Sequence, residues 1–390
     1  MKVTLCNRDK PEYGEATIPF PIPDEEYARF MERLERMQIG DVTGHDCHVA
    51  QIMDAPPALD MLEGTLVNVD ELDFLARSLE RFTNEELAKF QCMTTTRESW
   101  DMQSLINLSF ACEQTTVITN FADLERVGRN HYMTMHGGCC PAEEYRQLNG
   151  VGIARMLIAE GQGKVTPYGV LFENSMRLEP HYSGLSFPAF ADQYYLMELE
   201  FKTDLEESVP LFLPQPEKRL ERMLERARIK APQEVDIQTW YAEWPDALSD
   251  CLDFSREDIF TLNRLCAAVS KLDDKQMKKL SAAVMLAKPQ NAFQVCQLVK
   301  NLDQFDFIPG IRSAEEYGRY MIRDSGYFEY DENLDAYYDY AAYGQQRMNQ
   351  EYGEFNSAGY VAYHGTMSLE ELMTESPEGQ APALQMGGMA

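Results

Sequence analysis

The chain has 390 residues, a length typical of about two to four domains, and its 64 acidic against 35 basic residues give a formal charge of −29. Hydrophobic residues make up 44% and aromatic residues 11%, a composition that excludes a disordered acidic tail and predicts packed cores. So negative a field disfavours nucleic acid or an anionic membrane as a direct ligand and favours a basic partner.

The first half of the chain opens with residues typical of strands. Strands are predicted over 2–6 and 16–20, an amphipathic helix over 23–37, and a polar strand over 47–53. Near the end of this half, residues 163–170 read as a turn followed by a strand. The intervening helices are indicated by apolar residues at helical spacing, namely Leu72, Leu75, Leu79, Phe82, Leu87 and Phe90.

The second half repeats this order of elements. Strands are predicted over 195–201 and 210–214, a helix over 217–229, and a strand-like stretch over 235–244. Residues 353–361 repeat the closing turn and strand. The apolar positions of the helices match those of the first half if three residues are inserted, and they are Ile259, Leu262, Val269, Leu272, Met277 and Leu280.

Glycines set the register between the halves. Gly128 and Gly318 each stand before an arginine and lie 190 residues apart, and Gly169 and Gly359 have the same separation. An ordered series of like elements at a constant offset predicts a tandem duplication in an α+β chain of small α/β and helical domains. The predicted domains are a first module over 1–182, a packed aromatic link over 183–193, a second module over 194–366, and a mostly disordered tail over 367–390 with a short helix at 368–373.

The charge is spread along the chain, because residues 1–190 carry a net −13 and residues 191–390 a net −16. The N-terminus lacks the apolar region of a secretory signal, and no run approaches the ~18 apolar residues of a membrane span. Nine cysteines without regular spacing do not suggest a disulfide framework. We therefore expect a cytoplasmic protein with no membrane partner.

Cysteine and histidine gather in two places, residues 45–48 and 131–140. Neither place has the paired spacing of a structural zinc site, so the sequence assigns no metal. A Cys/His-dependent enzyme is the remote alternative, with Cys139 or Cys140 as nucleophile beside His131 or His136, although no third, orienting residue can be identified.

Phosphate chemistry has no support in the sequence. The run Gly161-Gln162-Gly163-Lys164 lacks the leading glycine spacing of a phosphate-binding loop and is interpreted as a turn. The pair Asp273-Asp274 stands where the polar start of a helix belongs, so it is interpreted as a helix cap.

The most informative stretch is residues 327–344, which holds five acids, six tyrosines and no base. Glu332, Asp335 and Asp339 fall at helical spacing, where like charges repel one another unless a partner needs them. The same helix would bury a stripe formed by Leu334, Tyr337, Tyr338 and Ala341. The segment therefore predicts a presented acidic surface made of Glu329, Asp331, Glu332, Asp335 and Asp339.

This stretch resembles a known family. Residues 332–344 are similar to the C-terminal signature of ArdA-type antirestriction proteins, a run of the form E-N-L-x-x-Y-F-D-Y-E-x-Y-[GA]. Residues 315–320 resemble the helix before that run, and residues 359–363 resemble the closing strand. The resemblance is specific over about residues 305–365 and looser over 6–40. The structural positions of the signature would be Tyr337, Tyr338, Tyr340, Tyr343, Gly318 and Gly359.

The resemblance implies a non-catalytic DNA mimic without cofactors. Proteins of this family are elongated, acidic and usually dimeric, are built from small α/β and helical domains, and belong to mobile elements. They occupy the DNA-binding groove of type I restriction–modification enzymes. The alternative is an acidic structural or regulatory protein of a mobile element that does not mimic DNA.

The sequence also departs from the family pattern. Asp331 stands where proline is common, Gln345 stands where arginine is common, and residues 148–156 of the first half have neither the acids nor the tyrosines. A usual family member is about as long as one half of this chain. The expected assembly is accordingly either a homodimer or an internal pseudo-dimer of the two modules.

Overall fold

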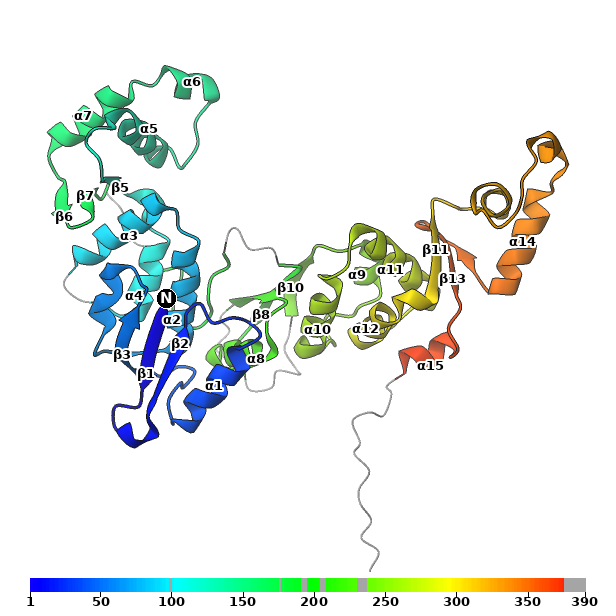
Figure 1. Ribbon diagram of the computed structural model, residues 1–390, viewed down its shortest axis with the longest axis horizontal. Helices are drawn as coiled ribbons and strands as arrows, with labels where there is room; N and C mark the ends of the chain where they lie inside the picture. Colours follow the sequence, from blue (N-terminus) through cyan, green and yellow to red (C-terminus); the bar gives the residue numbers. More distant parts are fainter. Residues whose placement is uncertain are drawn as a thin grey trace, which may run out of the picture. The chain divides into compact units, whose positions relative to one another are not determined.

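A computed structural model describes residues 1–97, 100–174, 177, 179–190, 195–203, 208–229 and 237–374. The chain forms two compact units, which Figure 1 labels along the sequence. Unit 1 comprises Met1–Gln193 and Pro216–Lys230, and unit 2 comprises Tyr194–Gln215 and Ala231–Ala390. The division therefore differs from the predicted one at residue 194, because a helical segment of the second half groups with the first.

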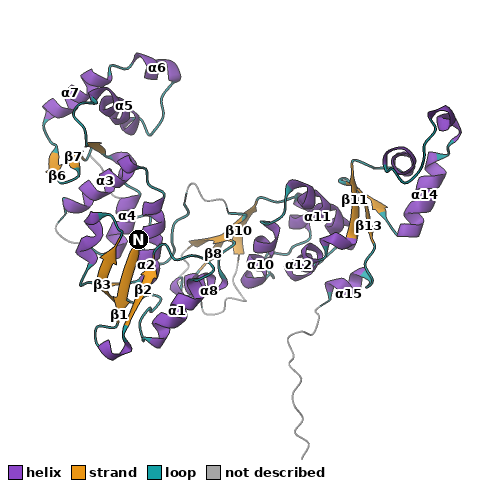
Figure 2. Ribbon diagram, viewed as in Figure 1, coloured by secondary structure: helices purple, strands orange, loops and turns teal. Residues whose placement is uncertain are grey.

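Unit 1 contains two antiparallel sheets and a set of helices (Figure 2). The first sheet has the strand order β2-β1-β3-β4 and the second the order β5-β7-β6. The elements are β1 (Lys2–Cys6), β2 (Glu15–Pro19), α1 (Tyr27–Arg36), β3 (Cys47–Met53), β4 (Leu66–Val67), α2 (Val69–Glu80), α3 (Asn84–Thr95), α4 (Met102–Ser109), β5 (Thr116–Ile118), α5 (Leu124–Met135), α6 (Ala142–Gln147), α7 (Gly150–Glu160), β6 (Lys164–Thr166), β7 (Gly169–Phe172) and α8 (Glu217–Arg226).

Unit 2 also contains two antiparallel sheets, of order β10-β8-β9 and β11-β13-β12. Its elements are β8 (Met197–Lys202), β9 (Ser208–Leu213), β10 (Ile237–Ala242), α9 (Asp246–Asp250), α10 (Ile259–Val269), α11 (Asp274–Ala287), α12 (Ala292–Lys300), β11 (Phe305–Pro309), α13 (Ala314–Arg319), α14 (Tyr340–Glu351), β12 (Glu354–Phe355), β13 (Gly359–Tyr363) and α15 (Leu369–Met373). The predicted mixed α+β class with several small antiparallel sheets is confirmed.

The same order of elements occurs twice. In each half a hairpin contributes two strands, a third strand pairs with the first strand of that hairpin, three helices follow, and the last strand of a second sheet lies between the other two. Helices α2, α3, α4, α5 and α7 begin 190 residues before α10, α11, α12, α13 and α14, respectively. The predicted three-residue insertion is wrong, because α10 begins at Ile259, opposite Val69, so that Leu262 matches Leu72.

Local sequence signals account for most element boundaries. The side chain of Asn68 accepts the amide hydrogens of Asp70 and Glu71 and so caps α2. Three further helices begin with capping boxes: Thr83 with Glu86, Asp273 with Gln276, and Ser368 with Glu371. The interpretation of Asp273 as a cap and the short helix predicted at 368–373 are thereby confirmed, whereas residues 375–390 of the predicted tail lie outside the described residues.

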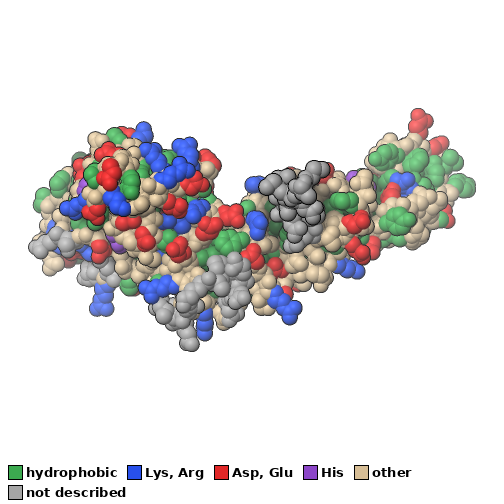
Figure 3. Space-filling model, turned by 90° about the horizontal axis from the view of Figure 1, so that it is seen from below, with side chains coloured by type: hydrophobic (Ala, Val, Ile, Leu, Met, Phe, Trp, Pro, Cys, Tyr) green, Lys and Arg blue, Asp and Glu red, His purple; other side chains and the backbone are tan. Residues whose placement is uncertain are grey.

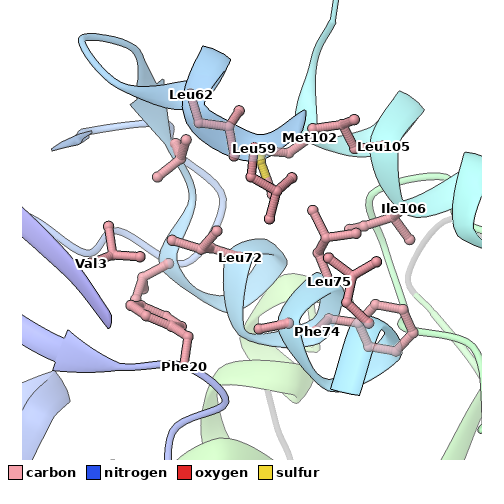
Figure 4. Close-up of a cluster of buried hydrophobic side chains, with 14 of the residues drawn as sticks. Val3, Phe20, Leu59, Leu62, Leu72, Phe74, Leu75, Met102, Leu105 and Ile106 are labelled. Atoms are coloured by element: carbon pink, nitrogen blue, oxygen red, sulfur yellow. The ribbon is translucent and has the colours of Figure 1, made fainter. Parts of the chain in front are cut away.

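The largest core of unit 1 joins its first sheet to α2 and α4 (Figure 4). Val3 and Phe20 on the sheet side face Leu72 on α2, and Leu105 packs from α4. Residues of the predicted link contribute as well, because the rings of Phe187 and Phe190 stack on Phe74 at 4.9 and 4.7 Å. Residues 191–193 of that link lie outside the described residues.

Candidate partner-binding surface

The acidic, tyrosine-rich stretch does not form the continuous helix that its spacing predicts. Residues 320–324 form a π-helical turn, residues 332–337 form a 3₁₀ helix, and α14 begins only at Tyr340. Asp339 ends the 3₁₀ helix and caps α14, because its side chain accepts the amide hydrogen of Ala342 at 3.0 Å. The predicted helical stripe of Glu332, Asp335 and Asp339 is therefore wrong as a geometry.

Asp335 is held inside the segment. Its Oδ1 accepts the hydroxyl hydrogens of Tyr330 at 2.5 Å and Tyr340 at 2.6 Å, and a nitrogen of Arg323 lies 3.9 Å away. The Tyr330 hydroxyl is the largest of the influences that lower the pKa of Asp335, and the Tyr340 hydroxyl comes next. Asp335 thus orders the segment around itself, and only part of its charge faces outward.

The other predicted acids are on the surface. Glu329, Asp331, Glu332 and Asp339 are exposed, and Asp331 caps the 3₁₀ helix by accepting the amide hydrogen of Asn333 at 2.9 Å. The ion pair recorded for this segment joins Arg323 to Asp335 and leaves Glu329 and Glu332 in contact with solvent. The described structure therefore presents Glu329, Asp331 and Glu332 as a compact group of outward carboxylates.

The predicted burial of the tyrosines is partly wrong. Tyr337 is 84% exposed and Leu334 is 48% exposed, so the predicted buried stripe does not exist. Tyr340 is buried in its place, because the cap at Asp339 rotates the start of α14. Tyr338 and Tyr343 are half-buried, and the ring of Tyr343 meets that of Phe328 edge-on at 6.0 Å.

The signature glycines allow backbones to approach closely. A Cβ on Gly318 of α13 would lie 1.9 Å from the carbonyl oxygen of Tyr340, the first residue of α14. Gly344 has the same role from the other side, since its Cβ would lie 1.8 Å from the carbonyl oxygen of Ala314. Gly359 has φ +153, and a Cβ there would meet the Ile308 carbonyl oxygen at 2.2 Å. These glycines are structural and bring α13, α14 and the strands into contact.

Two structural residues of this region escaped the sequence analysis. Gly344 was seen only as the end of a motif, although a second glycine at helical spacing could have marked a helix crossing. Glu351 was not singled out, yet its Oε2 accepts the hydroxyl hydrogens of Tyr317 at 2.5 Å and Tyr360 at 2.7 Å. Burial and the Glu351 contact raise the pKa of both tyrosines.

The candidate cysteines and histidines do not converge. His131 Nδ1 lies 2.9 Å from Thr116 Oγ1, and His136 bonds the backbone oxygen of Tyr132. Cys140 Sγ lies 3.4 Å from Met133 Sδ, whereas Cys139 is exposed. Among the described residues, no three His, Cys, Asp or Glu side chains are grouped so as to hold a metal ion.

Acidic side chains are distributed over the molecular surface. On the face shown in Figure 3 they are interspersed with lysines and arginines and do not gather in one patch. In the described part of the chain, no helix is both long and apolar enough to cross a membrane. The exposed carboxylates of residues 329–332 are therefore distinguished by their local group and by the neighbouring exposed aromatic residues, Tyr327, Phe328 and Tyr337.

Comparison with known proteins identifies the second half. Residues 208–362 match the model of the antirestriction protein (ArdA) family, and this range contains every signature residue discussed above. No curated protein is detectably similar to the chain. The match leaves residues 1–207 uncovered, so it does not extend to a second module. Over residues 208–362 the chain belongs to the ArdA family of antirestriction proteins, which are not enzymes.

Proposed function

We propose that the chain inhibits type I restriction–modification enzymes in the cytosol by presenting carboxylates to the lysines and arginines that normally hold DNA phosphates. The observation that carries this proposal is the family match over residues 208–362 in a chain of net charge −29. Duplex DNA carries one charge per ~1.7 Å of axis, so this charge corresponds to about 50 Å of duplex, roughly 15 base pairs. No cofactor and no direct contact with nucleic acid is part of this mechanism.

Inhibition by carboxylates should depend on salt as DNA binding does. We expect the full chain to compete with DNA for a type I methyltransferase, and its inhibition constant to rise steeply between low and high ionic strength. The measurement is a competition titration at several salt concentrations with the enzyme held constant. Competition that is independent of salt would contradict DNA mimicry and favour an apolar interface, and absence of competition would leave the acidic structural or regulatory role.

We further propose that residues 1–182 form a second module of the same kind, and that the two modules act as an internal pseudo-dimer. The recurrence of the element order at an offset of 190 residues supports this proposal. Joining the modules in one chain raises the effective concentration of the second module, so no partner chain would be required. The unequal acidic segments, with no tyrosine-rich run in the first half, are the argument for a homodimer formed through the second half.

The mass of the inhibitory species distinguishes these assemblies. If the pseudo-dimer is correct, we expect the chain to sediment as a monomer at the concentrations at which it inhibits. Analytical ultracentrifugation over a dilution series, spanning the inhibition constant, provides the measurement. A dimer that persists through that range would contradict the pseudo-dimer and leave the antirestriction activity itself unaffected.

A further inference from the structure

Helix α8 presents three arginines on one face. Arg219, Arg222 and Arg226 lie three and four residues apart, so all three project from the same side of the helix. The side chain of Arg222 is only 6% exposed, and its Nη2 lies 2.7 Å from Asp70 Oδ2 while its Nε lies 3.2 Å from Oδ1. This is the forked geometry by which a guanidinium binds a carboxylate.

Arg226 is buried still more deeply, with 3% of its side chain exposed. Its Nη1 donates to the Tyr182 hydroxyl at 2.8 Å, and its Nη2 donates to Asn68 Oδ1 at 2.7 Å and to the Val42 carbonyl oxygen. The Tyr182 hydroxyl in turn donates to Glu71 Oε1 at 2.9 Å. Arg226 therefore reaches the capping residue of α2 and, at 3.6 Å, the carboxylate of Glu71.

Arg219 completes the row at the edge of the contact. It lies 2.6 Å from Asp24 Oδ1 and 3.4 Å from Asp73 Oδ2, and its guanidinium stacks over the Tyr27 ring at 4.3 Å. Arg77 of α2 shares both of these carboxylates. The arginines lower the pKa of Asp24, even though burial alone would raise it.

The carboxylates on α2 require these partners. The side chains of Asp70, Glu71 and Asp73 are 8%, 5% and 6% exposed. Acids in the first turn of a helix complement its dipole, but that effect is small beside the cost of burying a charge without a counter-charge. Without α8, Asp70 and Glu71 would be left facing an empty surface as a concentrated acidic site.

The counterparts of these residues at the offset of 190 do not match one another. Where α8 has Arg219, Arg222 and Arg226, helix α1 has Arg29, Glu32 and Arg36. Where α2 has Asp70, Glu71 and Asp73, helix α10 has Phe260, Thr261 and Asn263. A glutamate at the position of Arg222 would face Asp70, and a phenylalanine at the position of Asp70 would leave that arginine without a counter-charge. Of the four possible pairings, only α8 with α2 is complementary.

We propose that the acidic N-terminal end of α2 is a recognition surface for a basic helix with arginines three and four residues apart, and that α8 of the same chain is its dedicated occupant. The surface accepts α8 and rejects α1, so the two like segments of the repeat are not interchangeable. The occupied surface also withdraws Asp70, Glu71 and Asp73 from any external basic partner. This inference concerns α8 and α2 alone and does not depend on antirestriction activity.

A double-mutant cycle in the full chain tests the pairing. Arg222→Met and Asp70→Leu should each leave a buried charge uncompensated and speed hydrogen exchange of the α8 amides by roughly a hundredfold. Combining them replaces the ion pair with apolar groups, so exchange in the double variant should return most of the way to that of the parent. Exchange is read by mass spectrometry on α8, with α11 of unit 2 as an internal reference.

The matched control is Arg36→Met, which removes the arginine of α1 that corresponds to Arg226 and is 80% exposed. It should leave the exchange of α8 unchanged. Effects of Arg222→Met and Asp70→Leu that simply add, or a control variant that behaves like them, would overturn the proposal. If either single variant unfolds unit 1, the double variant decides, because recovery of the fold supports the pairing and failure to recover refutes it.

Discussion

Gly318→Ala should destabilise the region of α13 and α14 by about 3 kcal/mol or more, because overpacking that forces backbone shifts has at least this cost. The added Cβ would lie 1.9 Å from the Tyr340 carbonyl oxygen, and a backbone atom cannot turn aside as a flexible side chain can. The two helices would have to separate. The sign is informative, since the same replacement within an unobstructed helix stabilises by about 0.5–1 kcal/mol. The measurement is hydrogen exchange of α14 together with urea unfolding of the full chain.

Gly326→Ala is the matched control in the same region. A Cβ at Gly326 meets nothing within 4 Å, but its φ of +75 makes any side chain there strained. It should cost about 1–2 kcal/mol, the price of a left-handed conformation alone. If Gly318→Ala were no more destabilising than this control, the close helix crossing would be refuted. Gly128→Ala should behave like Gly318→Ala, because its Cβ would lie 1.8 Å from the Gly150 carbonyl oxygen.

Elements with a strong local signal could be predicted from the sequence. The strands over 2–6 and 47–53 were placed to the residue, because their burial alternates or ends at clear breaks. Capping side chains placed the starts of α11 and α15 for the same reason. The constant offset between the halves was also visible, since glycines at close backbone contacts cannot be replaced without cost.

What the sequence could not reveal depends on contacts between distant residues. Periodicity alone predicted one helix across residues 332–341, but Asp339 caps α14 and interrupts it, so Tyr340 is buried and Tyr337 is exposed. The arginines of α8 looked like an ordinary charged helix face, because Asp70 lies 152 residues away from Arg222 in the chain. No local pattern identifies such a partner.

Neutralising the three outward carboxylates near the signature should weaken inhibition while leaving the fold intact. The variant is Glu329→Gln, Asp331→Asn and Glu332→Gln, in which asparagine retains the capping role of Asp331. Because these side chains are exposed, unfolding free energy should change by less than about 0.5 kcal/mol per substitution. If each acid replaces one phosphate, the slope of log affinity against log salt should fall by about 0.9 per acid. Affinity for a type I methyltransferase, titrated at several salt concentrations, provides both quantities.

Two comparisons separate the local surface from the general charge. Asp9→Asn, Glu12→Gln and Asp60→Asn remove the same net charge from exposed positions in unit 1 and should change the affinity less. Asp335→Asn should instead loosen the segment, because the bonds from Tyr330 and Tyr340 then end on a neutral amide. It should weaken inhibition with little change of salt slope. Equal losses from both triple variants would contradict a specific role for residues 329–332, since the long-range field would then account for binding without them.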